Sequence, residues 1–170
     1  MGLIGGSVAL ALKKVHFVSH IVGVGRNQLG LEKALQIGVI DSICDMQEAN
    51  VHNNSSLVKS IADADMILIA APVAQTKSIL QSIQPHLQLQ TVITDVGSTK
   101  SDVLACAREI LGVQFNQFVG GHPIAGAEKS GVAAATADLF IGKNVVLTPT
   151  AETNKHAIDS VMQFWQACGA

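Results

Sequence analysis

Short apolar runs alternate along this chain with segments whose apolar residues have helical spacing. The runs fall at residues 21–26, 66–71, 91–98, 117–123 and 144–149, and the helical segments at residues 29–38, 74–87, 100–111 and 153–169. An apolar run of this length without polar interruption is typical of a strand that is covered on both faces, as in parallel sheets between helices. The sequence therefore predicts an α/β domain with a mostly parallel sheet and right-handed crossovers.

Several details of these helices follow from their end residues and spacing. Gly38 is expected to end the helix of residues 29–38, and Ser98 or Ser101 to cap the helix of residues 100–111. The last helix is expected to bury one apolar side, formed by Ile158, Val161, Met162 and Trp165. The polar stretch at residues 45–56 is expected to be a surface excursion.

The composition is that of one globular domain. The chain has 170 residues, of which 48% are apolar and 14% charged, so it can bury a core and is not disordered. Its net charge of −2 and the absence of a basic run argue against nucleic-acid binding. Three widely spaced cysteines without a CxxC pair favour neither a metal site nor disulfides, and free thiols suit the cytoplasm. With no run of about 18 apolar residues, no membrane span is expected.

The opening residues, MGLIGGSVALAL, match the second half of the G-x-G-x-x-G fingerprint of Rossmann dinucleotide-binding domains. Gly2 and Gly5 align with its last two glycines, whereas the first glycine and the strand before it are absent. A tight turn before a helix would explain the glycines equally well. The helix that follows favours a phosphate loop, because a helix N-terminus offers unpaired N–H groups and a positive dipole end to a pyrophosphate. The expected cofactor-binding residues are Gly2, Leu3, Ile4, Gly5, Gly6 and Ser7.

The run at residues 21–26 ends at Gly25, 20 residues after Gly5, where a Rossmann domain contacts the adenosine ribose. Enzymes that use NAD usually carry an Asp or Glu there, and this chain carries Arg26 instead. A guanidinium can pair with the 2′-phosphate of NADP, so we expect NADP to be preferred over NAD. The alternative is that Arg26 is only a solvated turn residue.

Two stretches exceed what a generic dinucleotide-binding domain requires. They are TDVGSTKSDV at residues 94–103 and the stretch of residues 119–149 that opens with VGGHPIAGAEKSG, and each begins in an apolar run. Ligands bind at the carboxyl ends of the strands in such sheets, so both stretches are expected at that edge. His122 follows a glycine pair and precedes Pro123, which makes its imidazole a candidate general base.

These stretches, together with GLIGGS at the start and LTP at residues 147–149, resemble the prephenate dehydrogenase family, which includes arogenate and cyclohexadienyl dehydrogenases. The resemblance covers nearly the whole chain in order. It implies NAD(P)-dependent oxidative decarboxylation of prephenate to 4-hydroxyphenylpyruvate, or of arogenate to tyrosine, in tyrosine biosynthesis.

The resemblance also implies roles for individual residues. His122 matches the histidine that takes the proton of the ring hydroxyl, and Ser98 a serine beside it that orients the hydroxyl and the nicotinamide. Glu128 matches an acidic residue of prephenate-using members. Apart from the resemblance, Lys100 and Lys129 could attract the dianionic substrate, although exposed lysines usually do nothing specific. The turn with Ala71, Pro72 and Val73 matches a segment that lies along the cofactor.

Two family features are missing from the sequence. The first strand with its glycine does not precede Met1, and no helical dimerisation domain follows. We therefore expect residues 1–170 to be a nucleotide-binding domain truncated at both ends, with little activity by itself. The full protein is expected to be a cytoplasmic homodimer through the missing domain. Two other readings stay open: another NADP-dependent dehydrogenase of the β-hydroxyacid type, and a nucleotide-binding module without catalysis. The choice between prephenate and arogenate also stays open, with Glu128 leaning toward prephenate.

Overall fold

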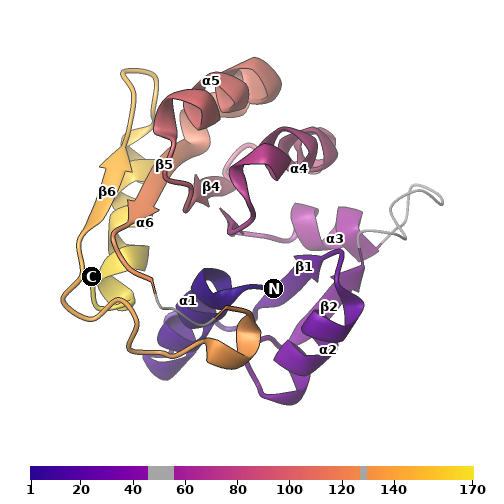
Figure 1. The fold of residues 1–170 in the computed structure, drawn as a ribbon. Coiled ribbons are helices and arrows are strands. Elements are labelled where there is room, and N and C mark those ends of the chain that lie inside the picture. The colour runs from indigo at the N-terminus through magenta and orange to yellow at the C-terminus, as the bar shows by residue number, and fades with distance from the viewer. Residues whose placement is uncertain (46–55, 127–129) are drawn as a thin grey trace. The chain divides into compact units, whose positions relative to one another are not determined.

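The computed structural model describes residues 1–45, 56–126 and 130–170 of the chain, which divides into two compact units. Unit 1 comprises residues 1–60, 125–143 and 166–170, and unit 2 comprises residues 61–124 and 144–165. Strands β1 and β2 form one sheet, and β3 to β6 form another (Figure 1). The α/β architecture with parallel pairing confirms the fold class expected from the alternation of runs and helices.

Unit 1 is built on a two-stranded parallel sheet. Its regular elements are α1 (Leu3–Lys14), β1 (Val22–Gly25), α2 (Gln28–Gln36), β2 (Ser42–Asp45), the first residues of α3 (Ser56–Ala62) and the 3-10 turn η5 (Val132–Ala134). β1 ends at Gly25, as the fingerprint spacing predicts, and Gly38 follows α2 with a φ of 74° that favours glycine. Neither β2 nor α3 was expected from the sequence. The polar stretch of residues 45–56 lies almost wholly outside the described residues.

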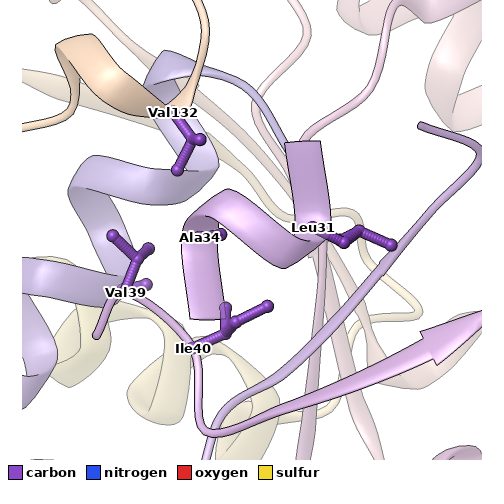
Figure 2. Packing of buried hydrophobic residues seen from close by; sticks show 6 residues of the cluster. Leu31, Ala34, Val39, Ile40 and Val132 are labelled. Carbon is purple, nitrogen blue, oxygen red and sulfur yellow. The ribbon is translucent and has the colours of Figure 1, made fainter. Parts of the chain in front are cut away.

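The core of unit 1 joins segments that are distant in sequence. Leu31 and Ala34 of α2 pack with Val39, Ile40 and Val132 (Figure 2). α1 approaches the same η5 turn, because a Cβ added to Gly6 would lie 2.9 Å from Cβ of Ala135. The small residues of α1 thus permit close packing as expected: Gly6 approaches the η5 turn, and Ala9 belongs to the core cluster against which Ile43 of β2 packs.

An ion pair joins the end of α1 to residues beside α2, β1 and β2 in unit 1. Nζ of Lys13, at the end of α1, donates to Oδ1 of Asp41 at 2.6 Å and to the carbonyl of Gly38 at 3.0 Å. The backbone N–H of Ile21 donates to Oδ2 of Asp41 at 2.8 Å. The hydrogen bond from Lys13 lowers the pKa of the Asp41 carboxyl below its ordinary value of 3.8, against the opposing effect of burial.

Unit 2 carries the larger sheet, with the order β3-β4-β5-β6. β3, β4 and β5 run parallel, and β6 pairs antiparallel with β5. The strands are β3 (Met66–Ile69), β4 (Val92–Asp95), β5 (Phe118–Pro123) and β6 (Val145–Thr148). The helical elements are the rest of α3, η2 (Val73–Gln75), α4 (Thr76–Ile83), η3 (Gln84–His86), α5 (Lys100–Leu111), η4 (Gly112–Gln117) and most of α6 (Lys155–Ala167).

The sequence predictions for unit 2 hold for the elements and fail in some details. α5 has the predicted bounds, but neither Ser98 nor Ser101 caps it: Thr99 is the N-cap residue, and its side chain makes no capping hydrogen bond. β4 is buried along its length, whereas residues 66–68 of β3 are only half-buried, because among the described strands β3 pairs with β4 alone. In α6, Val161 is buried as predicted and Met162 is 45% exposed.

No helix within the described ranges is both long and apolar enough to cross a membrane.

The Lys13–Asp41 pair leads to a prediction about stability. Because the folded-state pKa of Asp41 is lowered, its carboxylate stabilises the fold at pH values above 3.8, and this stabilisation is lost as the pH falls through the folded-state pKa. We expect Asp41→Asn to lower the free energy of unfolding by about 1 kcal/mol at pH 7 and by progressively less in acid. Urea unfolding over a range of pH measures the difference.

Asp138→Asn is the matched control. Asp138 pairs with Lys14 at 2.7 Å, but both side chains are more than half exposed, so its loss is expected to change stability little at any pH. Equal effects of the two substitutions would contradict the role given to Asp41.

Candidate active site

The glycine loop ends at an uncapped helix N-terminus in unit 1. Gly2 is the N-cap residue of α1 with an extended backbone, and no side chain caps the helix. The N–H groups of the first turn have no partners inside a helix, and the first turn of α1 holds no acidic residue that would repel an anion. A Cβ added to Gly2 would meet no atom within 4 Å, so the space beside it is open.

The six predicted loop residues divide into two groups. Gly2, Leu3, Ile4 and Gly5 are half-buried, so they retain exposed surface. Gly6 and Ser7 are buried. Oγ of Ser7 accepts a hydrogen bond from the N–H of Thr136 at 3.1 Å, so this hydroxyl faces the segment after η5.

Arg26 lies beside this loop. A Cβ added to Gly25 would lie 3.9 Å from the backbone nitrogen of Met1, so the end of β1 and the start of the glycine loop are neighbours. Arg26 is exposed and forms no ion pair with any residue that the structure describes. Asn27 caps α2 by accepting from the N–H of Gly30 at 3.1 Å, which fixes the turn that presents the guanidinium.

The other predicted site residues lie in unit 2, at the carboxyl ends of three parallel strands. Ala71 to Val73 follow β3, Ser98 follows β4, and His122 lies near the end of β5. A Cβ added to Gly97 would lie 2.9 Å from Cγ2 of Val73, so the turn after β3 touches the loop after β4. The structure therefore gathers these segments at one edge of the sheet, as the sequence predicted.

Individual side chains at this edge differ in exposure. Ser98 and Pro72 are exposed, whereas Ala71, Val73 and His122 are half-buried. The backbone of His122 pairs with Val146 of β6. Glu128 and Lys129 lie outside the described residues.

A buried ion pair lies behind this edge. Nζ of Lys100, the first residue of α5, donates to Oδ2 of Asp95 at the end of β4, and the side chains are only 12% and 3% exposed. Asp95 also accepts from the N–H of Gly97 at 2.8 Å and from that of Gly121 at 3.1 Å. Lys100 further donates to the carbonyl of Gly121 at 2.7 Å.

This arrangement decides how Lys100 is used. The sequence left it as an exposed lysine that could attract substrate or do nothing specific, but its charge is turned inward onto Asp95 and Gly121. Burial lowers the pKa of the Lys100 ammonium, and the hydrogen bond and charge of Asp95 oppose that effect. Asp95 was not singled out from the sequence. The available signal was a carboxylate ending an apolar strand, with a lysine five residues later.

No cluster of three or more potential metal ligands occurs within the part of the chain that the structure describes.

Comparisons with known proteins match this chain to prephenate dehydrogenases. A family model described as "Prephenate dehydrogenase, nucleotide-binding domain" matches residues 8–170. The prephenate dehydrogenase of Bacillus subtilis (strain 168) is 39% identical over 171 residues, which cover 100% of this chain and 43% of that protein.

Solved structures of prephenate and arogenate dehydrogenases also resemble this chain. The crystal structure of prephenate dehydrogenase from A. aeolicus in complex with hydroxyphenyl propionate and NAD+ matches with a TM-score of 0.84 and 33% identity, over 99% of this chain and 55% of that one. The structure of Synechocystis arogenate dehydrogenase matches with a TM-score of 0.83 and 28% identity, over 99% of this chain and 55% of that one. The chain thus spans about half the length of the proteins it matches.

The glycine loop can be tested by two alanine substitutions. We expect Gly2→Ala to leave the free energy of unfolding within about 0.5 kcal/mol, because its Cβ enters open space. The same methyl group would obstruct a pyrophosphate, so the dissociation constant for the dinucleotide should rise about tenfold or more. Calorimetric titration and urea unfolding measure the two effects.

Gly6→Ala is the companion variant. Overpacking against Ala135 costs about 1–3 kcal/mol, and the gain of about 1 kcal/mol in helix propensity offsets it only in part. We therefore expect Gly6→Ala to destabilise the chain. Unchanged dinucleotide affinity in a folded Gly2→Ala chain would show that the loop is only a turn.

Proposed function

Because this chain belongs to the prephenate dehydrogenase family through its nucleotide-binding domain, we propose that it binds a nicotinamide dinucleotide and supplies the base for oxidative decarboxylation of prephenate or arogenate in tyrosine biosynthesis. The observation that carries the proposal is that Gly97 and Gly121, which directly precede Ser98 and His122, both bond Asp95, with Val73 against Gly97. The whole activity belongs to a protein about twice the length of this chain.

In this proposal a bound dinucleotide would supply the acceptor for the hydride that leaves the carbinol carbon of the substrate. Positive character builds on that carbon as the hydride leaves, so removal of the hydroxyl proton lowers the barrier. The imidazole of His122 accepts that proton in its neutral form, and the hydroxyl of Ser98 orients the group that reacts. Loss of CO2 makes the ring aromatic, so no activated nucleophile is required.

Unit 1 would hold the pyrophosphate of the dinucleotide. Gly2 to Gly5 would contact the pyrophosphate at the N-terminus of α1, while Gly6 and Ser7 support the helix by packing. Ala71 to Val73 would lie along the cofactor. Glu128 and Lys129 are proposed to contact the substrate, with Glu128 favouring prephenate.

We further propose that residues 1–170 form the nucleotide-binding part of a homodimeric enzyme whose dimer contacts lie in a further domain. Since the chain spans 43% of its Bacillus subtilis relative, we expect the 170 residues alone to turn over little substrate. The strand expected before Met1 also stays a prediction.

Replacing the base tests the function. In the intact protein, we expect His122→Asn to lower kcat by roughly 10²–10⁴-fold, the usual range for a general base, with the dinucleotide dissociation constant unchanged. Steady-state assays that cross prephenate and arogenate with NAD and NADP measure the first effect, and fluorescence titration the second.

His156→Asn, at an exposed position of α6, serves as the control and should behave like the wild type. Full turnover by His122→Asn would remove His122 from the mechanism. Dinucleotide binding without turnover of either acid by the wild type would favour a binding module.

The cofactor preference is tested at Arg26. We propose that NADP binds more tightly than NAD, because the exposed guanidinium can bind the 2′-phosphate. A charge-assisted hydrogen bond contributes about 1.5–3 kcal/mol, so Arg26→Ala should weaken NADP binding roughly 10- to 100-fold and barely change NAD binding.

Lys33→Ala removes another exposed cation of the same unit and should leave both affinities unchanged. Tighter binding of NAD than of NADP by the wild type would contradict the assignment.

A further inference from the structure

The buried pair of Asp95 and Lys100 is an expensive way to hold a helix against a strand. Taking both charges out of water costs several kcal/mol per ion, and a well-packed apolar pair often stabilises a fold as well or better. Packing alone therefore does not account for the pair. The effect of the pair lies in the main-chain segments to which it is hydrogen-bonded.

Among the described residues, every hydrogen bond of these two side chains, apart from the one between their own charges, goes to the backbone of Gly97 or Gly121. Gly97 directly precedes Ser98, and Gly121 directly precedes His122. The Asp95 carboxylate bonds one oxygen to each glycine N–H, and Lys100 bonds the carbonyl of Gly121. One ion pair thus hydrogen-bonds the main chain of the residues that directly precede Ser98 and His122.

Glycines stand where the main chain lies close to Asp95 and Lys100. A Cβ at Gly121 would lie 2.7 Å from the carbonyl oxygen of Asp95, and one at Gly97 would lie 3.0 Å from Oδ2 of the same residue. At Gly120, an added Cβ would lie 3.4 Å from Cδ of Lys100, whose stem passes over that position. A side chain at Gly121 would collide with the main chain of Asp95, and one at Gly97 would crowd the Asp95 carboxylate, whereas the Gly120 contact is of ordinary van der Waals length.

We propose that Asp95, neutralised by Lys100, is the positioning residue that fixes the separation of Ser98 and His122. The roles of Ser98 and His122 in this inference rest on the proposed function, whereas the anchoring of Gly97 and Gly121 rests on the hydrogen bonds. Asp95 touches no reacting atom. It acts through Gly97 and Gly121, and through Gly97 on Val73, whose methyl group would lie 2.9 Å from a Cβ at that glycine.

The test separates anchoring from stability by removing the charges one at a time and together. Asp95→Asn and Lys100→Met each leave one buried charge unpaired, so each should lower the urea midpoint of unfolding. In the double variant no unpaired charge remains, and the midpoint should return toward that of the wild type.

In the double variant, kcat should stay low although the urea midpoint of unfolding recovers. The double variant lacks the ammonium on the Gly121 carbonyl, and the side-chain amide that replaces the Asp95 carboxylate has one acceptor oxygen instead of two, so it cannot bond each glycine N–H with a separate oxygen. We expect kcat of the intact protein to stay roughly 100-fold low, the scale of a 1 Å misplacement. Recovery of kcat together with the midpoint would show that the pair is structural only and would overturn the proposal.

A second measurement does not depend on turnover. In the 170-residue chain, amide hydrogen exchange at Gly97 and Gly121 should be faster in the double variant, while Ile93 in the middle of β4 stays protected. Unchanged exchange at both glycines would overturn the anchoring role. If the proposed function is wrong, the wild-type protein turns over neither acid although both glycine amides are protected, which is a different result.

Lys77→Met is the matched control, because Lys77 is 60% exposed and its distance to Glu109 is 3.9 Å. It should change neither exchange nor kcat. A comparable loss of kcat in this variant would trace the effect to any lysine on these helices and would overturn the specific role of Lys100.

Discussion

At Gly121 the backbone of β5 comes so close to the end of β4 that even a methyl group would collide with the carbonyl oxygen of Asp95. This approach lets a short carboxylate at the end of one strand accept a hydrogen bond from the backbone of the next. It also brings the Gly121 carbonyl within reach of Lys100. This close approach and the hydrogen bonds of Asp95 and Lys100 together link the strand ends that carry Ser98 and His122.

The two units use ion pairs in physically different settings. Lys13 and Asp41 are each about 31% exposed, so water and salt screen their attraction, and the pair adds a modest increment to the stability of unit 1. Asp95 and Lys100 are almost fully enclosed, where removal of one partner leaves a charge with no water around it. The first pair joins residues beside several elements, whereas the second is part of a buried hydrogen-bond network with Gly97 and Gly121.

Local signals in the sequence were sufficient for most elements and for part of the site. α5 begins and ends where its apolar spacing predicts, and the glycine pair before His122 marks the strand end that carries it. β2 escaped prediction because it has only two apolar residues, Ile43 and Cys44, and forms by pairing with β1. The residues of either segment alone do not show that two strands separated by a helix will pair. The sequence likewise shows that Lys100 is charged but not that its stem crosses Gly120 into the interior, because burial is a property of the folded chain.

Arg26 stands apart from these interlocked groups. It follows β1, its turn is fixed by the Asn27 cap, and its guanidinium forms no ion pair among the described residues. Replacing it would therefore break no ion pair on which that part of the fold relies. If this position governs the choice between two dinucleotides, a lineage could exchange one for the other by a single codon change, without a compensating mutation elsewhere. Asp95 and Gly121 have no such freedom, since each is held by the other.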